Sequence, residues 1–251
     1  MARQKGIIPL QGAIGDVNFF KSKDGFMAGR KGGVSGDRIA TEAKFQRTRE
    51  NNAEFGRAAT YGKLIRNAFQ ALLLNAKDSR STARLGGEMR KVIKADLVNE
   101  RGMRNIIDGE AELLQDFDFN VNGQLASNFK AQFTASISRV TGVLEVSIPS
   151  FIPKNQLIAP GGTTHYTIHC GGSAINFEQN EFETQINSSA QLPFDNAATA
   201  AMVLTNQVTA NSPYPLFLVL GIEYFQQVNG VMYPLKGGSF NSLKLVKILG
   251  Y

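Results

Sequence analysis

The sequence has very few of the side chains that disulfide, metal and hydrolytic chemistry require. Its 251 residues include one cysteine, Cys170, so no internal disulfide can form. The chain either matures in a reducing compartment or does not depend on oxidation. The only histidines are His165 and His169. On a strand they would share a face but lie roughly 13 Å apart, which is too far to share a zinc ion. We therefore predict no metal site and no bound cofactor.

Long apolar stretches are also scarce. The longest, "PLFLVLGI" at residues 215–222, is far shorter than the roughly 20 residues that a membrane-spanning helix needs. The stretch "MARQKGIIPLQGAIGDV" is interrupted by Pro9 and Gly12 before an apolar run of signal-peptide length develops. We predict no membrane span and no secretory leader, which favours a cytoplasmic protein or part of a particle assembled in the cytoplasm.

Recognisable catalytic and ligand-binding motifs are missing as well. No G-x-S-x-G elbow occurs, and "GRKGGVSG" at residues 29–36 places its lysine before the paired glycines, which is not the order of a phosphate-binding loop. The acidic "DGEAELLQDFDF" at residues 108–119 lacks the ligand spacing of an EF-hand and is better explained as a linker. We predict a protein that is not an enzyme, with no catalytic residues and no small-molecule substrate.

A marked separation of charge is the clearest feature that the sequence does have. Residues 1–107 carry 21 Lys and Arg against 10 Asp and Glu, a net charge of +11, and residues 108–251 carry 6 against 11, a net charge of −5. A basic half can bind polyanions, but it can equally bind the acidic half of a neighbouring copy, head to tail.

Residues 1–50 have the pattern of an extended arm. Short apolar stretches at residues 17–21 and 26–29 flank an Asp-Gly pair, which is a strong hairpin signal. A two-stranded ribbon is only marginally stable by itself and must pack on something. The residues expected to form this assembly arm are Phe19, Phe20, Asp24, Gly25 and Phe26, followed by a basic, glycine-rich connector.

Residues 51–107 have the 3.6-residue apolar periodicity of a helical pair. The first helix is expected at residues 51–75 and the second from Asp78 to Ile106 or Ile107, with a break or kink at Gly86–Gly87. Basic side chains lie mainly off the apolar stripe, where they are either a solvated face or contacts for a polyanion. The candidates for polyanion contacts are Arg30, Lys31, Arg57, Arg66, Arg84, Arg90, Lys91 and Lys94.

Residues 108–251 alternate apolar and polar positions with the period of a strand. A hairpin is expected at residues 133–138 and 144–148. Further strands are expected at residues 163–170, 174–178, 181–186, 199–205, 216–226, 231–235 and 243–249. This pattern predicts an α+β chain in which the hairpin arm and helical pair precede an antiparallel β-sandwich, of either jelly-roll or immunoglobulin-like topology.

Four stretches of the sequence carry a resemblance to a known family. They are "GIIPLQGAIGDVNFFKSKDGFMAGRKGG", "FQRTRENNAEFGRA", "RGMRNIIDGEAELL" and "LGIEYFQQVNGVMYPLKGGSFNSL". With these, the chain resembles an uncharacterised protein family of Bacteroidota genomes over essentially its whole length. The resemblance implies a bacterial or phage-related setting and an N-terminal ribbon ahead of a β-rich end. It implies no activity and no ligand, so no functional residue is carried over.

Together these features favour a non-enzymatic, self-assembling structural protein that forms a coat, tube, filament or shell through its N-terminal arm. In this hypothesis its partners are other copies of itself. The alternative is a nucleic-acid-binding or packaging protein that uses the basic half, although the sequence has no recognisable reader motif. A third class, an enzyme or carbohydrate-binding module built on the sandwich, has the least support from the residues.

Overall fold

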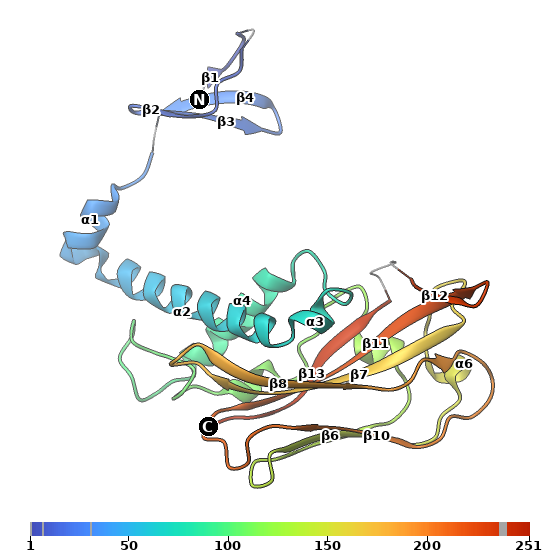
Figure 1. The fold of residues 1–251 in the computed structure, drawn as a ribbon. Helices are drawn as coiled ribbons and strands as arrows, with labels where there is room; N and C mark the ends of the chain where they lie inside the picture. The colour runs from blue at the N-terminus through green and yellow to red at the C-terminus, as the bar shows by residue number, and fades with distance from the viewer. Residues whose placement is uncertain (1, 7, 31, 236–239) are drawn as a thin grey trace. The chain divides into compact units, whose positions relative to one another are not determined.

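The computed structural model describes residues 2–6, 8–30, 32–235 and 240–251. The chain divides into two compact units, Met1–Arg49 and Glu50–Tyr251 (Figure 1). The smaller unit is a sheet followed by short helical turns. The larger unit combines helices with two antiparallel sheets, so the expected mixture of helices and antiparallel strands is confirmed.

The small unit contains a four-stranded antiparallel sheet with strand order β1-β4-β3-β2. The strands are β1 (Ala2–Arg3), β2 (Gly12–Ile14), β3 (Val17–Ser22) and β4 (Gly25–Arg30). The predicted hairpin is confirmed as β3–β4, in which Ser22 pairs with Gly25. Gly25 has φ +107°, a conformation that glycine adopts without strain. The sequence pattern missed the two short outer strands. Helix α1 (Gly36–Thr41) and the 3-10 turn η1 (Ala43–Phe45) follow the sheet.

The predicted helical pair is present, but its boundaries differ from those expected. Its helices are α2 (Gln46–Ala68), α3 (Gln70–Leu73) and α4 (Ser81–Lys94). The first helix is interrupted at Phe69, whose φ of −107° and ψ of 23° depart from helical values. The expected break at Gly86–Gly87 is wrong, because α4 continues through both glycines.

Helix α4 ends at Lys94 and not near Ile106 because Asp96 forms the next loop instead. The Asp96 carboxylate is buried and accepts hydrogen bonds from the backbone N–H groups of Val98, Asn99 and Asn105 at 2.9, 2.9 and 3.0 Å. These bonds satisfy the loop backbone in a non-helical conformation, which is how aspartate competes with a helix. Burial raises the pKa of Asp96, but these N–H groups outweigh it and hold the pKa below its ordinary value.

Two sheets make up the rest of the large unit. A six-stranded sheet contains the path β12-β11-β7-β8, with β13 on β11 and β9 on β7, and a three-stranded sheet has the order β10-β6-β5. The strands are β5 (Thr134–Ser138), β6 (Val143–Ile148), β7 (His165–Asn176), β8 (Glu181–Ser188), β9 (Leu192–Pro193), β10 (Met202–Gln207), β11 (Leu216–Val228), β12 (Val231–Pro234) and β13 (Ser242–Leu249). The short helical turns η2 (Ala111–Leu114) and α5 (Leu125–Asn128) lie between α4 and β5, and α6 (Pro153–Gln156) lies between β6 and β7.

Strand β11 divides two buried apolar clusters. Phe217 and Val219 belong to the cluster shared with α2 and α4, whereas Leu218, Leu220 and Ile222 belong to the cluster shared with β6 and β10. Figure 1 shows the corresponding layers, with the helices on one side of β7, β8 and β13 and the strands β6 and β10 on the other. The continuous apolar run at residues 216–222 is explained, since a strand that is buried on both faces needs apolar residues at successive positions.

Strand β7 is continuous where the sequence predicted two strands separated by a Gly-Gly turn. A Cβ atom on Gly171 would lie 2.9 Å from Val219 Cγ2 and 3.2 Å from atoms of Phe69 and Leu72. A Cβ atom on Gly172 would lie 2.9 Å from Asn206 Cβ and 3.2 Å from Leu144 Cβ. The two glycines therefore mark the place where a layer approaches each face of the strand closely, and not a turn.

The two sheets also approach each other at their margins. Along one margin Asn187 Nδ2 of β8 donates to the Thr205 carbonyl of β10 at 3.2 Å, and the backbone N–H of Gln207 donates to Gln185 Oε1. At the other margin Lys247 Nζ of β13 donates to the Ala135 carbonyl of β5 at 3.2 Å. The curled larger sheet is thus held to the smaller one by side chains rather than by a continuous backbone ladder.

We predict that Gly172→Ala destabilises the large unit by about 1–3 kcal/mol, because the added methyl group must displace Leu144 or Asn206. The matched control is Gly86→Ala on α4, where the added Cβ meets open space and should stabilise the helix by about 0.5–1 kcal/mol. Urea unfolding of both variants measures the difference. If Gly172→Ala is as stable as the parent chain or more stable, the neighbouring layer does not pack closely against β7 at this position.

We predict that Asp96→Asn lowers the free energy of unfolding at pH 7 by about 1–3 kcal/mol, because the loop N–H groups lose a charged acceptor. The folded pKa of Asp96 is depressed, so its contribution is present above the unfolded pKa of about 3.9 and is lost as pH falls through the folded value. Urea unfolding between pH 7 and pH 3 should show a shallower acid dependence for Asp96→Asn than for the parent chain. Glu100→Gln, at an exposed position in the same loop, is the control and should match the parent.

Candidate assembly interface

The N-terminal sheet has no core of its own. None of the described residues between 2 and 49 is buried. Large apolar side chains are exposed in and around the sheet, among them Ile8 at 79% and Ile14 at 65%. A sheet of this size normally needs a covering layer over an apolar face to be stable. The unit therefore presents apolar surface that nothing else in the unit covers.

Strand register places the arm residues on two faces of this sheet. Phe19 pairs with Ala28 and Lys21 with Phe26, while Phe20 pairs with Met27 between them. Residues directly opposite one another share a face and successive residues alternate. Phe19 and Phe26 are therefore on one face and Phe20 is on the other. All three phenylalanines are half-buried.

The hairpin end is ordered by local hydrogen bonds. The Asp24 N–H donates to Ser22 Oγ at 3.2 Å, and that hydroxyl donates to the Gly25 carbonyl at 3.3 Å. Lys21 Nζ lies 5.6 Å from the centre of the Phe26 ring, within cation–π range. The tip therefore combines an aromatic ring with the exposed ammonium groups of Lys21 and Lys23.

Four of the predicted polyanion contacts are engaged inside the large unit. Arg57 donates to the carbonyls of Gly102 and Arg104, and Arg66 donates to Thr82 Oγ1 at 2.7 Å. Arg84 forms an ion pair with Asp78 and donates to the Asp118 carbonyl at 2.8 Å. Lys91 donates to Glu88 at 2.8 Å. These bonds hold loops and helices of the same chain, so fewer donors remain to face a phosphate backbone.

The remaining predicted contacts are Arg90, Lys94, Arg30 and Lys31. Arg90 lies 5.9 Å from the ring centre of Phe55, at a groove of about 350 Å³ between α2 and α4. Lys94 is exposed, and Arg30 is exposed with its guanidinium 4.0 Å from the Asp16 carboxylate. Lys31 lies outside the described residues. Arg30 belongs to the small unit, whereas Arg90 and Lys94 belong to the large one.

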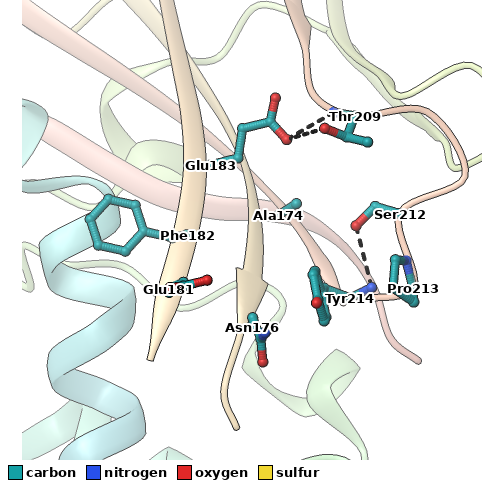
Figure 2. Close-up of a pocket in the computed structure, with 9 residues that line it drawn as sticks. All are labelled: Ala174, Asn176, Glu181, Phe182, Glu183, Thr209, Ser212, Pro213 and Tyr214. Atoms are coloured by element: carbon teal, nitrogen blue, oxygen red, sulfur yellow. Dashed lines mark hydrogen bonds between the residues drawn. The ribbon is translucent and has the colours of Figure 1, made fainter. Parts of the chain in front are cut away.

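An acidic pocket of about 250 Å³ lies beside the first residues of β8 (Figure 2). Glu181 and Glu183 point to its side of the strand, whereas the Phe182 ring points to the opposite side. The facing wall is the loop that carries Pro213 and Tyr214. The pocket thus pairs carboxylates with apolar surface, and sequence reasoning missed it because its two walls come from distant segments.

Hydrogen bonds hold both walls of this pocket in place. Glu183 Oε2 accepts from the N–H and the hydroxyl of Thr209 at 2.9 and 2.7 Å. Ser212 is buried, and Arg139 donates to the carbonyls of Ser212 and Tyr214. The wall of the pocket is therefore preformed, and an occupant would not need to order it on binding.

The two histidines both lie on β7, and each has its own hydrogen-bonding neighbours. His165 Nδ1 lies 3.0 Å from Thr164 Oγ1. His169 lies between Ser188 Oγ, 2.7 Å from Nδ1, and Glu223 Oε2, 3.3 Å from Nε2. The His169 side chain thus links β7 to β8 and β11. The adjoining cavity measures only about 70 Å³, which is room for about two waters and not for a larger substrate.

Other chemistry is limited among the residues that the structure describes. No group of three or more His, Cys, Asp or Glu side chains is placed to hold a metal ion. Burial raises the pKa of the Cys170 thiol to about 12, so the nucleophilic thiolate is strongly disfavoured at neutral pH. Within the same described ranges, no helix is both long and apolar enough to cross a bilayer.

Comparison with models of known protein families and with curated protein sequences gives no match. The resemblance to a Bacteroidota family therefore stays a prediction from the sequence.

We predict that Arg57→Ala destabilises the large unit by about 1–3 kcal/mol, since the carbonyls of Gly102 and Arg104 lose their shared donor. Lys94→Ala, which removes one charge from an exposed position near the end of α4, should change the stability by less than about 0.5 kcal/mol. Chemical unfolding of the two variants tests this division. If both substitutions change the free energy of unfolding by similarly small amounts, Arg57 is a surface cation that is available to a polyanion.

Proposed function

We propose that this chain is a non-enzymatic, self-assembling structural protein, a subunit of a coat, tube, filament or shell that is built in the cytoplasm. The proposal rests mainly on the N-terminal sheet, which has no buried residue among those described in its unit. Half-buried side chains such as Phe19 and Phe26 gain further hydrophobic stabilisation when another surface covers them. The neighbouring surface in this proposal belongs to another copy of the chain.

The large unit supplies the body of the proposed subunit. We propose that its two sheets form a β-sandwich, which is supported by the apolar cluster that β6 and β10 share with β7 and β11. The helices α2 and α4 bury their apolar stripes against the other face of the larger sheet. Such a unit has its own core, so it can remain folded while the N-terminal sheet engages a neighbour.

The dipolar charge of the sequence supports association between copies. The N-terminal half is basic and the remainder is acidic, and complementary charge speeds encounter and selects orientation more than it adds affinity. Because the N-terminal half is basic, nucleic-acid binding is the alternative function. The observation that favours this alternative is the groove where Arg90 stacks near the exposed ring of Phe55, because aromatic and basic side chains together can bind a single strand.

We predict that deletion of residues 2–36 converts an assembling protein into a soluble, folded monomer, because both apolar clusters lie in the large unit. Light scattering and electron microscopy of the full chain and the deletion variant measure assembly, and circular dichroism checks the fold. Assemblies of unchanged size and form after the deletion would rule out the arm mechanism.

The same samples separate assembly from nucleic-acid binding. The absorbance ratio at 260 and 280 nm reports bound nucleic acid, and titration with single-stranded DNA at rising salt measures the electrostatic contribution. Steeply salt-dependent binding by a chain that stays monomeric would favour the alternative. Assembly without bound nucleic acid would favour the structural role.

A further inference from the structure

We propose that the acidic pocket at the start of β8 receives the hairpin tip of a second copy of this chain, with Lys21 and Lys23 facing Glu181 and Glu183. This inference rests on the proposed function, because it names the surface that the arm would bind. It is carried by complementarity between a tip that presents two lysines beside an aromatic ring and a pocket bordered by two glutamates and an apolar wall.

The pocket has the chemistry to bind a lysine that lies beside an aromatic ring. Glu181 and Glu183 are exposed and point to the pocket side of β8, while Pro213 and Tyr214 provide apolar surface opposite them. Glu183 is fixed by Thr209 through one carboxylate oxygen, Oε2. An approaching ammonium group would meet the Glu183 carboxylate, which Thr209 orients, and the exposed carboxylate of Glu181, and the adjacent ring would lie on the apolar wall.

The tip of the hairpin has the complementary arrangement. Lys21 and Phe26 are opposite one another on β3 and β4, with the ammonium group over the ring. The two-residue loop consists of Lys23 and Asp24, both exposed, so the tip carries two ammonium groups and one carboxylate. The pocket, at about 250 Å³, has room for one or two large side chains but not for a whole strand. The tip is therefore the part of the arm that fits, and the rest of the sheet would lie outside the pocket.

The hydrogen bonds along β8 also favour its first residues as the binding site. The second half of β8 is already engaged, since Gln185 and Asn187 bond to Gln207 and Thr205 of β10. Its first residues, Glu181 and Glu183, are the ones that border the pocket. Contacts of this kind are individually weak at a partly exposed site, so stable assembly would depend on their repetition in every subunit.

The test is a charge swap in the full-length protein. Lys21→Glu and Glu181→Lys should each weaken self-association by about tenfold or more, because each places like charges together. The double variant, Lys21→Glu with Glu181→Lys, should recover most of the parent affinity. Sedimentation velocity over a concentration series measures the dissociation constant, and circular dichroism confirms that each variant is folded.

Two matched controls carry the same changes of charge at other exposed positions. Arg30→Glu alters the N-terminal sheet at the end of β4 opposite the hairpin tip, and Glu100→Lys alters the loop after α4. Both should leave self-association within about threefold of the parent. Equal weakening by the controls and the tip variants would mean that net charge, and not this contact, governs association.

Three other outcomes overturn the inference in distinguishable ways. If residues 2–36 are needed for assembly but neither single charge swap weakens it, the acceptor is another surface and the proposed function stands. The second outcome is a chain that stays monomeric at every concentration, with each single swap lowering its melting temperature and the double variant restoring it. In that case the tip binds its own chain. If the full chain never self-associates, both the inference and the proposed function fail.

Discussion

Burial of β7 and β11 on both faces is the constraint on which the large unit depends. Alternate residues of β11 enter different apolar clusters, so the same strand supports the helices on one side and the smaller sheet on the other. Gly171 and Gly172 allow both layers to come close to β7. A larger residue at either position would push a whole layer outward, because protein interiors are close-packed and deform little.

The small unit, unlike the large one, has no buried layer within its described ranges. Its sheet has regular register and an ordered turn, yet none of its described residues is buried. Local hydrogen bonding gives the hairpin its form, whereas the free energy to hold a sheet normally comes from covering an apolar face. This contrast between a self-sufficient unit and a dependent one is the physical basis for proposing that the chain assembles.

Polar side chains in the large unit mostly serve its own architecture. Asp96 orders the loop after α4, Arg57 fixes residues 102–104, and His169 joins three strands through Ser188 and Glu223. A basic or catalytic residue type therefore says little about function until its partners are known. Exposed groups with unfilled surroundings, such as Glu181 beside the pocket, are the better indicators.

The sequence by itself determined the local elements: the hairpin around Asp24–Gly25, the helical pair, the strands at residues 134–138 and 143–148, and the centrally buried run of β11. These follow from periodicity and turn chemistry, which act over a few neighbouring residues. Tertiary structure alone decided that Gly171–Gly172 lies within a strand and that Glu183 and Tyr214 share a pocket. Each depends on contacts between segments far apart in the chain, and local patterns carry no information about which distant atoms will occupy the space beside them.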